Sequence, residues 1–117
     1  MKAKELRIGN LVRILTKNPK KEKPLFDYKV EKIDLNDFLY FDNEVYKPIP
    51  LTEEWLLKFG FKKYSNDIRF LQKGSLKLKN TERGFKFYYV ESIIYITSVH
   101  QLQNLYYTLT KTELNYE

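Results

Sequence analysis

The chain of 117 residues contains no cysteine and no long apolar run. The absence of cysteine excludes disulfides, thiol catalysis and thiolate metal sites. No apolar stretch approaches the length needed to cross a bilayer, and the charged residues 1–5 are not followed by the apolar segment of a secretion signal. The sequence therefore predicts a soluble protein of the cytoplasm that has no membrane partner.

Residues suited to catalysis and metal binding are also scarce. His100 is the only histidine, and a general base would need partners that the sequence does not place near it, so we expect a structural or exposed role. The carboxylates of the N-terminal half lack calcium-loop spacing, and the glycines are too scattered to cradle a phosphate. We expect neither an enzyme nor a protein with a metal or a cofactor. These carboxylates are Asp27, Asp34, Asp37, Asp42 and Glu44, and the glycines are Gly9, Gly60, Gly74 and Gly84.

Positive charge, by contrast, is plentiful and unevenly distributed. The formal net charge is +6 at pH 7. Residues 58–90 contain nine Lys or Arg against two Asp or Glu, a net charge of +7, and residues 1–35 contain ten against five, a net charge of +5. Residues 36–57, which lie between them, contain one basic residue against five acidic ones. Two basic zones separated by an acidic one predict a polarised surface.

A short helix is predicted near the middle of the chain, within residues 48–61 (PIPLTEEWLLKFGF). Thr52 can cap its first turn, and the two glutamates that follow suit the positive end of the helix dipole. Trp55 and Phe59 share an apolar face, and Gly60 suits the position after the last turn. Because a helix this short is not stable alone, we expect tertiary packing to hold it between two β-segments.

The part of the chain before this helix is expected to be a small β-module. Its run from Ile8 to Val12 resembles the opening of SH3-like barrels. Residues 16–24, with four lysines and two prolines, are expected to form an exposed loop. The predicted strands, which would form a meander of three to four strands, are residues 11–15, 26–32, 38–41 and 44–47.

The part after the helix is expected to be an antiparallel hairpin sheet covered by a C-terminal helix. Residues 62–67 are assigned to a polar connection and residues 80–84 to a hairpin loop. Ser98 and Gln101 form the capping box of a helix from about Val99 to Leu109. The predicted strands are residues 68–71, 75–79, 85–89 and 93–96.

Taken together, the pattern predicts a single domain of the α+β class. It would consist of an SH3-like or meander β-module at about residues 1–50, a helix at about 52–60, a second sheet at about 68–97 and a C-terminal helix at about 98–110.

The second sheet carries a basic face that we interpret as a macromolecule-binding surface. Cations that reach phosphates, interleaved with an aromatic ring that can stack on a base, are what a nucleic-acid-binding sheet needs. The competing interpretation is a solvated face, because lysines also protect exposed strands from aggregation. A second, weaker patch consists of Lys17, Lys20, Lys21 and Lys23. The candidate binding residues are Arg69, Lys73, Lys77, Lys79, Arg83, Lys86 and Tyr88.

Three segments carry a recognisable pattern in their order and spacing: residues 5–12 (ELRIGNLV), residues 48–61, and residues 99–107 (VHQLQNLYY) followed by Leu109 and Thr110. This pattern resembles a large family of small proteins encoded by bacteriophages and prophages of Bacteroidota, which have no assigned chemistry. The resemblance spans nearly the whole chain and implies a phage-encoded accessory protein acting in the host cytoplasm. It implies no catalytic or binding residue.

Two functions remain open at this level. The first is a non-enzymatic accessory protein that binds and modulates a host protein or ribonucleoprotein complex, for example an anti-CRISPR that inhibits an RNA-guided defence nuclease. The alternative is a direct RNA- or DNA-binding module that uses the same basic face.

Overall fold

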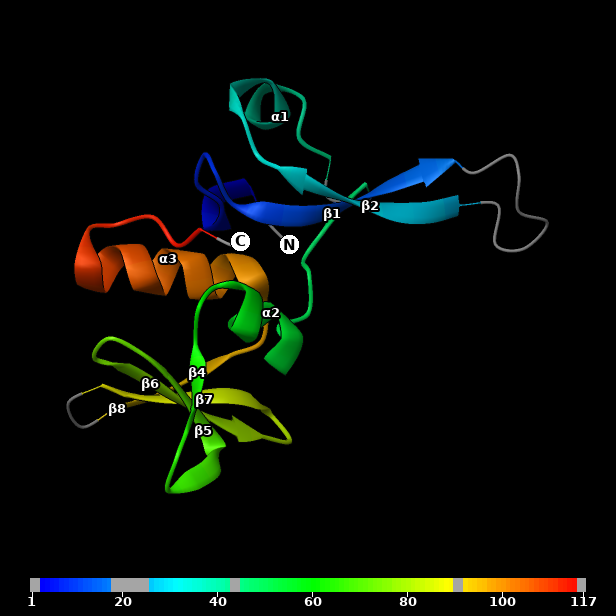
Figure 1. Cartoon of the computed structure of the whole chain (residues 1–117). Coiled ribbons are helices and arrows are strands. Elements are labelled where there is room, and N and C mark those ends of the chain that lie inside the picture. The colour runs from blue at the N-terminus through cyan, green and yellow to red at the C-terminus, as the bar shows by residue number, and fades with distance from the viewer. Residues whose placement is uncertain (1–2, 18–25, 43–44, 90–91, 116–117) are drawn as a thin grey trace. The chain divides into compact units, whose positions relative to one another are not determined.

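The computed structural model describes residues 3–17, 26–42, 45–89 and 92–115. The chain divides into two compact units, Met1–Ile49 and Pro50–Glu117. The first contains a three-stranded sheet and the second a five-stranded sheet with two helices, all strands antiparallel (Figure 1). The predicted α+β class is therefore confirmed.

In the sheet of the first unit the central strand is β1, the first strand along the chain. Strand β1 (Leu11–Lys17) pairs along its whole length with β2 (Phe26–Lys32), and on its other side with the short β3 (Tyr46–Lys47). The order β2-β1-β3 replaces the expected sequential meander. The predicted strands at residues 11–15 and 26–32 are confirmed. Residues 16 and 17 belong to β1 rather than to a loop, and residues 18–25, with Lys20, Lys21 and Lys23, lie outside the described residues.

A tight turn leads into β1 after a short 3₁₀ turn, η1 (Ala3–Glu5). Gly9 has φ 96°, which favours glycine. The buried side chain of Asn10 accepts a hydrogen bond from the backbone N–H of Arg7 at 2.6 Å. The backbone N–H of Gly9 donates a hydrogen bond to the carbonyl of Ile33 at 2.8 Å. The backbone N–H of Ile33 donates to the carbonyl of Asn10, also at 2.8 Å. These bonds hold the start of β1 against the end of β2.

The prediction of a strand at residues 38–41 is wrong, because residues 38 and 39 form the end of helix α1 (Leu35–Leu39) and the chain leaves the helix at Tyr40. Asp34 Oδ1 accepts from the backbone of Asp37 at 3.0 Å, and Asp37 Oδ2 accepts from the backbone of Asp34 at 2.8 Å. This reciprocal capping box starts the helix. A four-residue apolar run cannot by itself distinguish a strand from a helical turn. Phe38 packs against a small core of Leu6, Val12 and Ile33.

The second unit contains a sequential antiparallel sheet of five strands. Strand β4 lies within residues 62–67, which were expected to be a connection, so that prediction is wrong. Thr81 pairs with Gly84, so the loop between the next strands is shorter than the predicted residues 80–84. The strands are β4 (Lys62–Tyr64), β5 (Asp67–Lys73), β6 (Leu76–Thr81), β7 (Gly84–Tyr89) and β8 (Ser92–Ile96).

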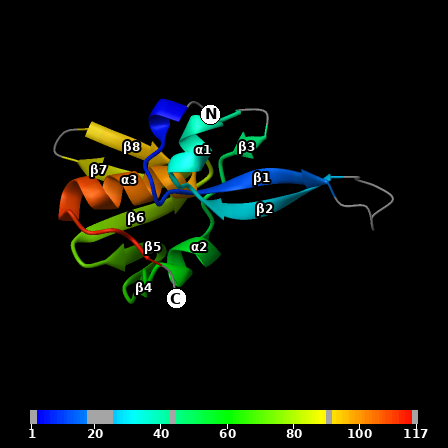
Figure 2. The same cartoon turned by 90° about the horizontal axis from the view of Figure 1, so that it is seen from above.

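Two helices accompany this sheet, α2 (Glu53–Lys58) and α3 (Val99–Thr110). The predicted cap of α2 is confirmed, whereas of the box predicted at Ser98 the Gln101 half is formed and Ser98 Oγ has no hydrogen-bond partner within the described residues. Thr52 Oγ1 accepts from the backbone of Trp55 at 3.3 Å, and Gly60 follows α2 with φ 93°. Gln101 Oε1 accepts from the backbone N–H of Ser98 at 3.3 Å. Figures 1 and 2 show α3 lying along one face of the sheet.

Side chains alternate between the two faces of the five-stranded sheet. On the helix side they are buried and apolar, as the alternation in β6 and β7 predicts. In the described part of the unit no helix covers the opposite face, so polar and charged side chains can lie there in contact with solvent. The buried sheet and helix residues include Leu71, Leu76, Leu78, Phe85, Phe87, Ile96, Val99 and Leu102.

Candidate nucleic-acid interface

The face of the five-stranded sheet that points away from α3 combines lysines with aromatic rings. Strand register places these residues on one side, because side chains along each strand alternate and paired residues point the same way. We call this surface the outer face. Register assigns to it Phe70, Gln72, Lys77, Lys79, Lys86, Tyr88, Ile93 and Tyr95. Tyr64 follows a register shift in β4 and is assigned to the outer face because the Lys77 ammonium group lies over its ring.

A single row crosses four strands of the outer face. Phe70 pairs with Lys79, Lys79 pairs with Lys86, and Lys86 pairs with Tyr95. Two lysines are therefore held directly opposite each other and flanked by an aromatic residue at either end. Like charges in that position destabilise a sheet. Among the described residues neither lysine forms a salt bridge with a carboxylate, so the row presents positive charge without a salt-bridged counter-ion.

The lysine ammonium groups lie over the rings of the outer face. Lys77 Nζ is 3.8 Å from the centroid of Tyr64 and 4.6 Å from that of Phe70. Lys86 Nζ is 4.9 Å from the centroid of Tyr88. A hydrogen bond between these two side chains raises the pKa of Lys86 and lowers the pKa of Tyr88. Exposed cation–π contacts stabilise by only about 0.5–1 kcal/mol each, so the ammonium groups can exchange these rings for another partner.

A hollow of about 360 Å³ opens at one end of the outer face. The ladder between β6 and β7 runs from Thr81 paired with Gly84 to Lys79 paired with Lys86, and the hollow lies beyond the Lys79 end. A second hollow, of about 440 Å³, lies on the helix side and shares two lining residues with the first, Ser75 and Phe87. The outer hollow is lined by Phe70, Ser75, Lys77, Phe87 and Tyr88.

Four of the seven predicted site residues come together on the outer face: Lys77, Lys79, Lys86 and Tyr88. Tyr88 is 52% exposed. Arg83 lies in the turn between β6 and β7, at the end of the hairpin away from the hollow.

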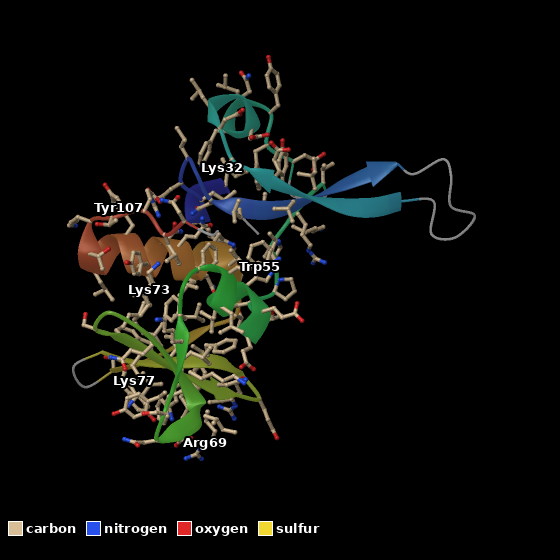
Figure 3. The ribbon with its side chains drawn as sticks, in the orientation of Figure 1. Lys32, Trp55, Arg69, Lys73, Lys77 and Tyr107 are labelled. Carbon is tan, nitrogen blue, oxygen red and sulfur yellow. The ribbon has the colours of Figure 1, made fainter. Side chains whose placement is uncertain are left out.

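Arg69 and Lys73 have partners within the fold. The guanidinium of Arg69 donates hydrogen bonds to the carboxylate of Asp67, from Nε to Oδ1 at 3.0 Å and from Nη2 to Oδ2 at 2.7 Å. Its hydrogen bonds lower the pKa of Asp67 to about 2. Lys73 lies on the helix side of the sheet, whereas Lys77 lies on the opposite side (Figure 3). Lys73 Nζ donates to the carbonyl of Phe59 at 2.5 Å, at the C-terminal end of α2.

Three aromatic residues of the outer face were not predicted as site residues. Phe70 could have been predicted as a site residue, because side chains alternate along a strand and Phe70 therefore lies on the opposite face of the sheet from its neighbour Leu71. Tyr64 was missed because residues 62–67 were assigned to a connection, and Tyr95 because its strand is apolar throughout. Their contribution depends on strand order, which the sequence pattern alone did not provide.

His100 is 2% exposed, in the first turn of α3. Among the described residues no group of three or more His, Cys, Asp or Glu is placed to hold a metal ion. Within the same residues, no helix combines the length and apolar character needed to span a membrane.

Comparison with known proteins found no matching family model, no matching curated protein and no matching solved structure.

Proposed function

We propose that this protein is a non-enzymatic binding module whose outer face holds single-stranded RNA or DNA. The observation that supports this most directly is the row Phe70, Lys79, Lys86 and Tyr95, in which paired lysines without ionic partners lie between aromatic residues. Lysines give sequence-independent affinity for phosphates, and exposed rings stack on unpaired bases.

The presence of rings among the lysines favours single strands over a duplex. In a double helix the base faces are stacked on each other, so the rings of Tyr88 and Tyr95 would have nothing to stack on. A single strand can turn its bases toward the sheet while its phosphates contact the lysines. Duplex binding through charge alone would leave these rings without a role.

Salt titration with matched lysine variants tests the proposal. A fluorescent single strand of about 12 nucleotides should bind at low salt, with log K falling linearly against log salt by about 0.7 per phosphate contact. The triple variant Lys77→Gln, Lys79→Gln, Lys86→Gln should reduce the steepness of that line by about 2. A double variant in the first unit, Lys4→Gln with Lys32→Gln, should leave the slope nearly unchanged. Absence of binding at low salt would refute the proposal.

A second candidate is supported by the edge strand β8. In the described part of the chain β8 has a strand neighbour on one side only. Its exposed residues Ile93, Ile94 and Tyr95 carry no charge. Such an edge can add a strand of a partner protein. This supports binding to a protein partner. As the second candidate we propose a phage-encoded accessory protein that binds a host machine in the cytoplasm, such as an RNA-guided nuclease that it inhibits.

Capture from host lysate separates the two candidates. If a host machine is the partner, immobilised protein should retain one dominant protein or ribonucleoprotein, including after nuclease treatment. The variant Ile93→Lys with Tyr95→Lys should lose that capture, while the triple lysine variant should keep it. Loss of all captured material on nuclease treatment would favour direct nucleic-acid binding and remove the second candidate.

A further inference from the structure

The hollow at the end of the outer face has the wall chemistry of a nucleobase site. Phe70 and Tyr88 supply rings from β5 and β7, and Phe87 adds a third at 9% exposure. Its polar lining residues are Ser75, from the turn between β5 and β6, and Lys77, from β6. Ligand sites in proteins are mostly apolar and aromatic with a few polar groups that fix orientation. This lining fits a flat, partly polar ligand.

The position of the hollow follows from the strand pairing. Phe70, at one end of the basic row, lines the hollow, and so do Lys77 and Tyr88, which are two residues from Lys79 and Lys86 along β6 and β7. A strand of nucleic acid whose phosphates lie on Lys79 and Lys86 therefore passes directly beside this opening. The volume of about 360 Å³ is near the lower end of the range for small-ligand sites, roughly 300–1,000 Å³. It suits one base rather than a larger ligand.

We infer that the hollow between β6 and β7 receives one unpaired nucleobase of a bound single strand. The base stacks against Tyr88 or Phe70, and the hydroxyl of Ser75 contacts its polar edge. This inference rests on the proposed nucleic-acid binding and adds to it a specific site for a base.

Lys77 is the group that must move when the base enters. In the free protein its ammonium lies over the rings of Tyr64 and Phe70 at 3.8 Å and 4.6 Å. A base stacked on an aromatic side chain contributes more to binding than an exposed cation–π contact contributes to the fold. The exchange is therefore favourable, and the displaced ammonium group becomes available to an adjacent phosphate.

Abasic oligonucleotides test the inference with the unaltered protein. A single strand of about 12 nucleotides and its fully abasic counterpart carry the same phosphates, so they differ only in the presence of bases. We expect the abasic strand to bind at least about tenfold more weakly at the same salt concentration. Equal affinity would overturn the base site while leaving phosphate binding intact. Failure of both strands to bind at low salt would overturn the proposed function as well.

Two ring substitutions locate the effect. Tyr88→Leu removes a ring at the hollow, and Tyr95→Leu removes a ring of the outer face that does not line it. Thermal melting of both variants establishes that they are folded. Tyr88→Leu should lose up to about tenfold in affinity for the intact strand, more than Tyr95→Leu loses, and should show a smaller difference between intact and abasic strands than the unaltered protein does. Equal losses for the two variants would contradict a base site at the hollow.

Discussion

Lys77 and Tyr64 meet across an intervening strand, with the ammonium nitrogen of Lys77 3.8 Å from the centroid of the Tyr64 ring. Tyr64 belongs to β4 and Lys77 to β6, and Phe70 of β5 lies between them, 4.6 Å from the same nitrogen. One lysine thus covers two rings of the outer face. The lysines that would bind phosphates also shield the rings that would bind bases.

Lys73 and Lys77 are both lysines of the second sheet, but replacing Lys73 should mainly lower the stability of the fold, whereas replacing Lys77 should mainly weaken nucleic-acid binding. Lys73→Met removes the bond to the Phe59 carbonyl at the end of α2. A hydrogen bond from a charged group contributes about 1.5–3 kcal/mol, so the free energy of unfolding should fall by about that amount. Lys77→Met should lower it by less than about 1 kcal/mol and weaken nucleic-acid binding instead.

Urea denaturation and salt-dependent binding, measured on both lysine variants, check this separation. The Lys73→Met protein should bind nucleic acid as the unaltered protein does once it is folded. A Lys73→Met protein of normal stability with weakened binding would show that Lys73 belongs to the interface after all.

Gly84 occupies a position where a side chain does not fit. Its φ is 124°, and a Cβ would lie 2.9 Å from the carbonyl oxygen of Ile96 and 3.0 Å from Thr97 Cγ2. Gly84→Ala should therefore lower the free energy of unfolding by about 1–3 kcal/mol, measured by urea denaturation. Gly74→Asn is the matched control, because Gly74 has φ 59° with nothing within 4 Å of its Cβ position, and asparagine tolerates that conformation. Equal losses would contradict the steric argument.

Asp67 should limit binding by neutralising Arg69. The Asp67 carboxylate also lies close enough to Lys79 for that lysine to contribute to lowering its pKa. Asp67→Asn removes the negative charge and leaves the Arg69 guanidinium free for a phosphate, so affinity for a single strand should rise by the few-fold that about one more contact gives. Fluorescence anisotropy at moderate salt measures this. Glu54→Gln, the same charge change on α2, should have a smaller effect, and an equal effect would indicate a response to net charge only.

The Asp67 pair also has a defined pH dependence. The pKa of this carboxyl is about 2, below its ordinary value of 3.8. The stabilisation from the pair is therefore fully present above 3.8 and is lost as the pH falls through about 2. The Asp67→Asn protein lacks this carboxyl, so its free energy of unfolding, followed in an acid titration, should lack the fall that this pair contributes between pH 3.8 and about 2.

Tyr46 should make the first unit sensitive to alkaline pH. Burial and the hydrogen bond that its hydroxyl donates to Asp37 Oδ1 at 2.9 Å raise its pKa from 10.0 to about 12. Because the folded pKa lies above the unfolded one, this stabilisation is present below pH 10.0 and is lost as the pH rises toward about 12. Tyr46→Phe should cost about 0.5–1.5 kcal/mol at neutral pH.

Ultraviolet titration of tyrosinate formation measures the Tyr46 effect. The variant should lack a late component of the titration, which ionises toward pH about 12, and the stability difference between the two proteins should shrink above pH 10.0. A titration curve with the same late component in the variant would assign that component to another tyrosine.

Local signals explain what could be predicted from the sequence. Thr52 and Gly60 bracket α2, and Ser98 with Gln101 starts α3, because each of these caps works within a few residues of chain. The alternation of Leu76, Leu78, Phe85 and Phe87 with lysines and Tyr88 placed the buried and exposed sides of the β6–β7 hairpin correctly. Each of these predictions needed only a repeating pattern or a single turn of backbone.

The failures have a common physical cause in long-range pairing. Phe38 lies in a helix because a capping box and the core of Leu6, Val12 and Ile33 decide its conformation, not its apolar neighbours. Residues 62–64 form a strand because β5 offers them a partner, although their own sequence is polar. The contact of Tyr64 with Lys77 and the hollow beside Lys79 depend on that strand order, so the pattern of residues could not reveal them.

The two edges of the five-stranded sheet differ in a way that limits assembly. Strand β4 is short, carries Lys62 and Lys63, and its register shifts before Tyr64, so it resists the addition of another strand. Strand β8 is longer and uncharged. Of the edges that the described residues give this sheet, β8 is the one open to an edge-to-edge encounter between copies, and joining two β8 strands leaves neither of them with a free edge. Two copies can therefore pair through this sheet to form a dimer, but the described sheet has no second edge that accepts a strand, which a fibril would require.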